Sequence, residues 1–470
     1  MSDSNITNSK TPFFHLLKQA VRGDIKDFTS GSIDKAIFLL AVPMVLEMVL
    51  ESVFALVDIF FVNKISSQAS ATVGLTEAAL TILYSVAWGL AMGIMALVAR
   101  RTGEKEFTAA GNVAAQGIIV AVFFSVVISI IGFIYPKEIL SFMGAGSAVV
   151  NENFRFTQIM LTGNIVIMLL FVNNAIFRGA GDASIAMRTL LIANAINIIL
   201  DPLLIFGVGP FHKMGVMGAA VATTFGRSVG VVYQLYHLFN GKEIIRLVKK
   251  QFIINTAIIR SILNTSFGGM FQFIIGSCSW IFLARIIAQS GESTTSGYVT
   301  AIRICIFTIL PAWGLANAAA TLVGQNLGAG QPERAEKSVW RSAFLTVIFF
   351  AFVAVIFFFF GEGLMRFFTT DPVAIKAGTL CLHILAISYI FFAYGMIITQ
   401  AFNGAGDTKT PTVINLFVFW MLQIPLAYFM ATYLKMGPTG VYIAIGISES
   451  LLAVVSIIIF KRGKWKLVKV

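Results

Sequence analysis

The most regular feature of the sequence is a series of long apolar stretches separated by short polar segments. Each stretch is long enough to cross a hydrocarbon core as an α-helix, which needs about 20 residues. The alternation typical of barrel strands is absent, and the stretches are much longer than such strands. We therefore predict an all-α polytopic membrane protein with 12 transmembrane helices, over residues 36–63, 73–99, 110–135, 153–178, 186–208, 215–238, 257–290, 297–324, 337–361, 378–402, 411–434 and 437–460.

The composition supports a membrane protein. Of the 470 residues, 57% are hydrophobic and 12% are charged, whereas soluble domains carry about 25% charged residues. A soluble enzyme, a disordered chain and a fibrous repeat fit these values poorly. The four His and three Cys show no ligand spacing, so we expect no metal site, no cofactor and no enzymatic activity, and nothing indicates a nucleic-acid partner.

The distribution of basic residues predicts the orientation. Of the 34 Lys and Arg residues, 24 fall on the side that carries both termini, nine fall on the opposite side, and Arg227 lies inside a span. Basic residues mark cytoplasmic loops. We therefore expect a multi-pass protein of the cell membrane, inner in a cell with two, with both termini in the cytoplasm.

The sequence contains an internal repeat. Three segments recur at a constant offset of 225 residues, namely 87–91 (AWGLA) as 312–316, Leu97-Val98 with Gly103 as Leu322-Val323 with Gly328, and 177–182 (FRGAGD) as 402–407 (FNGAGD). Each half has an even number of spans, so the halves have the same topology and are related by an axis along the membrane normal. We predict two pseudo-symmetric six-helix lobes, an arrangement typical of alternating-access transporters.

The predicted domains follow from this division. Residues 13–21 within the N-terminal segment have the apolar spacing of a helix, which either lies on the inner leaflet or belongs to a short tethered tail. The expected order is a cytoplasmic N-terminal segment (1–35), the N-terminal lobe (36–238), a basic cytoplasmic linker (239–256), the C-terminal lobe (257–460) and a basic cytoplasmic tail (461–470).

The first span contains three acidic residues, Glu47, Glu51 and Asp58. Their spacing places them within about 40° of one another around a helix, and an ionisable group inside a membrane indicates a function by default. Pro43 lies on the same stripe and would bend the helix, since it removes a backbone hydrogen bond.

The fifth span places Asn197 and Asp201 on one helix face, directly before Pro202, a second candidate for a bend. Carboxylate and amide oxygens suit Na⁺, and carboxylates close together and away from water also hold a proton readily. A buried Asp that only stabilises a broken helix is the alternative. The second half has Ile424 opposite Asp201, which predicts that cation binding is confined to the N-terminal lobe. Glu449 is an exception, read either as structural or as lining a cavity.

These residues resemble the multidrug and toxic compound extrusion (MATE) family over nearly the whole chain. The resemblance rests on the two six-span halves and on the segments around Pro43 and residues 57–62, 178–182, 197–202 and 218–223. It implies an antiporter that exports amphipathic, usually cationic compounds in exchange for Na⁺ or H⁺. By position, four residues match the cation site of the prokaryotic DNA-damage-inducible-type branch: Asp58, Asn197, Asp201 and Thr223.

The resemblance also leaves alternatives open. Glu47 and Glu51 would suit organic cations if they line the substrate cavity, or they pair with Arg285, Arg303 or Arg227. Those arginines keep open a second function, a flippase for lipid-linked precursors or oligosaccharides of the related superfamily. The expected partners are a small organic cation or amphiphile and membrane lipid, and we expect a monomer.

Overall fold

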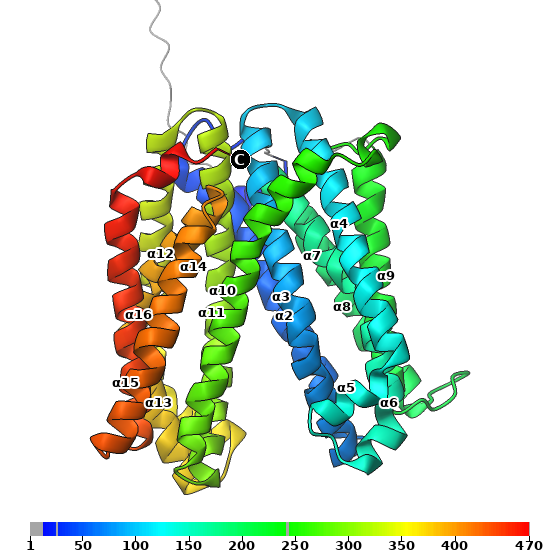
Figure 1. The fold of residues 1–470 in the computed structure, drawn as a ribbon, viewed down its shortest axis with the longest axis vertical. Coiled ribbons are helices and arrows are strands. Elements are labelled where there is room, and N and C mark those ends of the chain that lie inside the picture. The colour runs from blue at the N-terminus through cyan, green and yellow to red at the C-terminus, as the bar shows by residue number, and fades with distance from the viewer. Residues whose placement is uncertain (1–12, 25–26, 241–243, 470) are drawn as a thin grey trace, which may run out of the picture.

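The computed structural model describes residues 13–24, 27–240 and 244–469, apart from the side chains of residues 55, 56, 58, 59, 63, 67 and 148. Across these ranges the regular structure is helical, without a β-strand, and 12 helical segments are long and apolar enough to cross a membrane. The predicted all-α fold with twelve spans in two lobes is confirmed (Figure 1).

The N-terminal lobe contains the first six spans. One predicted span is divided into α6 and α7 at Gly163, where a Cβ would lie 2.8 Å from the Thr224 side chain. A short helix that was not predicted, α5, begins at Pro136. The helices of this lobe are α2 (Ile33–Asn63), α3 (Ser67–Gly103), α4 (Phe107–Ile134), α5 (Pro136–Phe142), α6 (Ser147–Thr162), α7 (Asn164–Ala180), α8 (Ala183–Phe206) and α9 (Val216–Asn240).

The C-terminal lobe contains the other six spans. The span predicted over 411–434 is present, but most of it has π-helical rather than α-helical turns. Pro425 donates no backbone hydrogen bond, so the α-helical pattern cannot pass through it unchanged. After η1 (Lys249–Phe252), the elements are α10 (Thr256–Ala288), α11 (Glu292–Gly328), α12 (Pro332–Phe368), α13 (Pro372–Gly404), α14 (Lys409–Asn415), η2 (Leu416–Gln423), α15 (Ile424–Tyr428), η3 (Phe429–Tyr433), α16 (Pro438–Lys461) and η4 (Lys464–Leu467).

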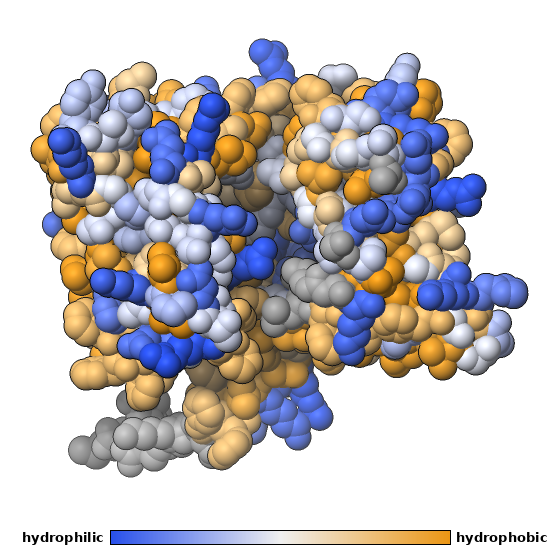
Figure 2. Space-filling view, turned by 90° about the horizontal axis from the view of Figure 1, so that it is seen from below, coloured by the Kyte–Doolittle hydropathy of each residue, from blue (hydrophilic) through white to orange (hydrophobic). Residues whose placement is uncertain are grey.

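The two lobes form a V. They lie close together at the face that carries the C-terminal end of the chain and diverge toward the opposite face (Figure 1). Seen from that opposite face, the surface is deeply hollowed between the lobes (Figure 2). The structure is therefore open on the side away from the C-terminus.

The repeated glycines allow the lobes to approach each other. A Cβ at Gly89 of α3 would lie 2.6 Å from the backbone nitrogen of Met270 in α10, and a Cβ at Gly314 of α11 would lie 2.6 Å from the Cα of Val45 in α2. Small residues let helix backbones come close in membranes, where packing holds helices together. The sequence repeat thus corresponds to two equivalent crossings between the lobes.

A second pair of repeated glycines lies at the closed face. A Cβ at Gly103 would overlap the carbonyl oxygen of Gln325, and a Cβ at Gly328 would overlap that of Arg100. Gln325 and Arg100 are themselves 225 residues apart. The crossing of α3 and α11 therefore follows the same two-fold relation as the sequence.

The N-terminal segment begins with α1 (Phe13–Arg22), which confirms the helix predicted there. Phe13 and Phe14 are exposed, as a helix lying on a membrane surface requires. On its other side, Arg188 of α8 donates hydrogen bonds to the carbonyl oxygens of Val21 (3.1 Å) and Arg22 (2.6 Å).

The N-terminal segment continues across to the other lobe. Arg334 of α12 donates to the carbonyl oxygens of Phe28, Ser30 and Gly31 at 2.8–3.2 Å. The C-terminal tail crosses in the opposite direction, because Val468 accepts a 2.7 Å hydrogen bond from Arg100 of α3. Both ends of the described chain therefore connect the two lobes.

Candidate functional site

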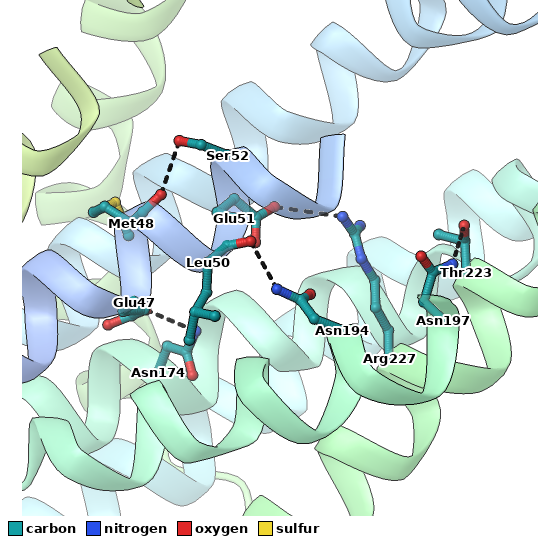
Figure 3. A network of polar contacts seen from close by, with 10 residues as sticks. All are labelled: Glu47, Met48, Leu50, Glu51, Ser52, Asn174, Asn194, Asn197, Thr223 and Arg227. Carbon is teal, nitrogen blue, oxygen red and sulfur yellow. Dashed lines mark hydrogen bonds and ion pairs between the residues drawn. The ribbon is translucent and has the colours of Figure 1, made fainter. Parts of the chain in front are cut away.

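The acidic residues of α2 point into the N-terminal lobe (Figure 3). Glu47 is buried, with 1% of its surface exposed, and accepts a 3.0 Å hydrogen bond from Asn174 Nδ2 of α7. Its Oε1 also lies 3.4 Å from Arg178 Nη1 in a buried ion pair. A third side chain, Gln234 of α9, donates to Asn174. Glu47 thus connects α2 to the interior of its own lobe.

Glu51 lies one turn further along α2 and forms a second ion pair. Its Oε1 is 3.4 Å from Arg227 Nη2 of α9 (Figure 3). The Arg227 guanidinium lies 4.7 Å from the centre of the Phe54 ring, a cation–π contact. Of the three arginines considered from the sequence, the structure places Arg227 next to Glu51. The pairing of Glu47 with Arg178 was not anticipated.

Three of the four predicted cation-site residues lie together between α8 and α9. Asn197 Nδ2 lies 3.4 Å from Asp201 Oδ1 and 3.3 Å from Thr223 Oγ1, and all three residues are buried (Figure 3). The two helices approach closely here, since a Cβ at Gly226 would lie 2.8 Å from the carbonyl oxygen of Ala193.

The fourth predicted residue, Asp58, belongs to α2, but its side chain lies outside the described parts of the structure. The two predicted bends remain predictions as well. Pro43 lies inside α2 and Pro202 inside α8, and both helices continue through the proline. Asn194 fixes α8 against α2 by donating a 2.7 Å hydrogen bond to the Leu50 carbonyl oxygen.

A cavity of about 290 Å³ lies on the C-terminal side of the space between the lobes. Trp88 of α3 and Trp313 of α11 form part of its wall, with ring centroids 5.4 Å apart and planes at 67°. Glu449 of α16 also borders this cavity, whereas Glu47 and Glu51 do not. Their assignment to a substrate cavity stays a prediction.

The sequence was compared with known families once this arrangement was described. The family model MatE matches residues 43–203 and again residues 269–429. The chain belongs to the MatE family. This multidrug and toxic compound extrusion family consists of transporters, so the protein is a multi-pass membrane transporter rather than an enzyme.

Individual members of the MatE family resemble the chain over almost its full length. The probable multidrug resistance protein NorM of Thermotoga maritima is 28% identical and covers 92% of this chain and 93% of its own. An FAD transporter of Shewanella oneidensis is 24% identical, over 85% of this chain and 88% of its own. A solved MATE family multidrug resistance transporter in an outward-facing conformation has a TM-score of 0.87 at 25% identity, over 97% and 98% of the two chains.

The C-terminal lobe of this MatE transporter has amides where the N-terminal lobe has acids. Gln272 of α10 and Asn403 of α13 exchange hydrogen bonds of 3.0 and 3.1 Å. Gln423 accepts a 2.8 Å hydrogen bond from Ser279. The described part of the chain contains no group of three or more His, Cys, Asp or Glu side chains placed to hold a metal ion. Neutral partners already satisfy these amides.

Sequence reasoning did not identify two groups of site residues in this MatE transporter. Arg178 was counted only as a loop charge, although it pairs with Glu47. The tryptophans of the cavity gave a usable signal, because Trp88 and Trp313 occupy equivalent places in the repeat. Residues of two halves on a shared pseudo-two-fold axis must meet, and the repeat could have been used in this way.

Proposed function

We propose that the protein is a secondary active antiporter that exports amphipathic organic cations in exchange for Na⁺ or H⁺. The observation that carries this proposal is the buried cluster of Asp201, Asn197 and Thr223 in a membrane-spanning lobe. A carboxylate inside a membrane is costly unless a counter-charge or a proton neutralises it. The cluster offers only oxygen ligands and one amide nitrogen, which suits a small hard cation or a proton.

The proposed site involves α2 through Asp58, which follows Glu51 on the same helix. Binding of a cation between Asp58 and the Asp201 cluster would draw α2 toward α8 and α9. The Glu51–Arg227 and Glu47–Arg178 pairs already connect α2 to α9 and α7. A movement of α2 must therefore rearrange these pairs, and cation occupancy would change the shape of the cleft. Coupling requires the drug and the cation to prefer different states.

The V-shaped structure corresponds to one state of this cycle. If both termini are cytoplasmic, as the basic residues predict, the cleft opens to the outside. The solved relative described as outward-facing has the same fold, and its multidrug resistance title, with that of NorM, supports drugs as substrates. The FAD transporter among the relatives provides an anionic nucleotide as the competing substrate to test.

The flippase alternative depends on free arginines that could hold a pyrophosphate. Arg227 lies against Glu51 and is almost completely buried, so its charge is already compensated. This pairing favours cation export over binding of an anionic lipid precursor.

The test uses purified protein in proteoliposomes with separately imposed Na⁺ and proton gradients. We expect one gradient to drive uptake of ethidium, a fluorescent organic cation, into inside-out vesicles. Asp201→Asn and Asp58→Asn should each abolish this uptake, and Glu362→Gln, an acid in an exposed ion pair on α12, should not. Gradient-driven transport at the normal rate in both Asn variants would refute the carboxylate assignment. Transport of FAD but not of ethidium would refute the substrate class.

A further inference from the structure

Glu449 is the acid that remains after the ion pairs of the spans are assigned. Its side chain lies on α16 with 9% of its surface exposed and borders the cavity between the lobes. Among the residues that the structure describes, it has no hydrogen bond and no ion pair. Glu47 and Glu51 differ in this respect, because an arginine lies against each of them.

The wall of the cavity around Glu449 is aromatic. Trp280 of α10 contributes a ring that is 39% exposed, and Trp88 and Trp313 contribute two more. No Lys or Arg is present among the described residues that line the cavity. Asn415 adds a buried amide oxygen without a hydrogen-bond partner in the described chain. The cavity therefore combines one negative charge, an unused acceptor and several π-faces.

This combination determines what the cavity can hold. A buried carboxylate without a partner costs several kcal/mol, and a ligand that brings a positive charge removes this cost. Aromatic faces attract the same charge by cation–π interaction, most strongly for Trp. A volume of about 290 Å³ accommodates one compact ring system rather than a nucleotide or a lipid head group.

We infer that the cavity beside Glu449 is a binding subsite for an aromatic monocation, with the Glu449 carboxylate as its counter-charge. The inference rests on the proposed export function and adds a site in the other lobe from Asp201. The coupling cation and the organic cation then occupy separate carboxylates, and their competition is transmitted through the position of the lobes rather than through one shared group.

The test is equilibrium binding to the purified full chain in nanodiscs at pH 8, with N-methylquinolinium as a permanently charged probe and quinoline as an uncharged probe of similar shape. Glu449→Gln keeps the side-chain volume and should weaken N-methylquinolinium binding about tenfold or more, while quinoline binding changes little. Trp280→Leu, at a partly exposed position, should weaken binding of the charged probe about threefold. Glu362→Gln is the matched control.

Two results would overturn the subsite. One is equal affinity of wild type and Glu449→Gln for N-methylquinolinium. The other is a Glu449→Gln variant that keeps its affinity but loses export, which would make Glu449 a proton carrier. Gradient-driven export by the wild type is measured in parallel, so that its absence counts against the proposed function while the binding ratio alone decides the subsite.

Discussion

Trp88 and Trp313, which stand at the same place in the two halves of the chain, meet edge to face with their ring centroids 5.4 Å apart. Neighbouring Gly89 and Gly314 bring the helices of the two lobes together around this pair. The rings therefore lie where the two lobes face each other, in the wall of the cavity that Glu449 borders.

The tryptophan contact predicts a measurable coupling between the lobes. Trp88→Leu and Trp313→Leu should each lower the free energy of unfolding, and the double variant should lower it by less than the sum. An aromatic pair contributes about 0.5–1.5 kcal/mol beyond burial, and this is the expected coupling energy. A double-mutant cycle in mild detergent measures it. Strict additivity would mean that the rings do not support each other.

The buried pair of Glu47 and Arg178 predicts a strong effect of removing one charge. Arg178→Gln should destabilise the protein by about 3 kcal/mol, because it leaves Glu47 buried opposite a neutral side chain. Combining it with Glu47→Gln should recover most of this loss. Thermal unfolding of the single and double variants tests the prediction. Arg366→Gln, which breaks an exposed pair with Glu362, is the control and should cost less than about 1 kcal/mol.

The glycines of the closed face predict intolerance to side chains. Gly103→Leu and Gly328→Leu should each destabilise the protein by at least about 1–3 kcal/mol, since a side chain would overlap the backbone of the opposite lobe. Gly74→Leu lies on the same helix as Gly103 and has open space at its Cβ. Size-exclusion profiles and melting temperatures of the three variants make the comparison. Equal behaviour of Gly74→Leu and Gly103→Leu would contradict the crossing.

The contact between Arg334 and the N-terminal segment predicts local protection from hydrogen exchange. Arg334→Ala removes the donor that holds three carbonyl oxygens between Phe28 and Gly31. Exchange of the backbone amides over 27–34 should accelerate about tenfold or more, because a charged donor stabilises by about 1.5–3 kcal/mol. Lys337→Ala on the same helix is the control. An unchanged rate would show that other contacts hold the segment.

Much of the architecture was accessible from the sequence, and the exceptions have local causes. Hydropathy alone located the twelve spans, since each must be apolar over its own length. It did not reveal the π-helical turns of η2 and η3, because they keep the same apolar composition as an α-helix. It also did not divide the fourth span at Gly163, where contact with the Thr224 side chain from α9 limits the space.

The candidate site divides in the same way. The spacing of Asn197 and Asp201 along one helix placed them on one face, and the structure brings Thr223 to them from the next helix. The pairing of acids with arginines could not be read from spacing. Glu47 and Arg178 are 131 residues apart, and Glu51 and Arg227 are 176 residues apart.

The sequence by itself determined the spans, the two-fold repeat and the presence of acids within the N-terminal lobe, because these are properties of single segments and of their periodicity. The tertiary structure decided which of those acids are neutralised by arginine and which one is not. That outcome depends on distances between helices that are far apart in the chain. It places Glu449 without a described partner beside the tryptophans, while Glu47 and Glu51 lie paired inside the other lobe.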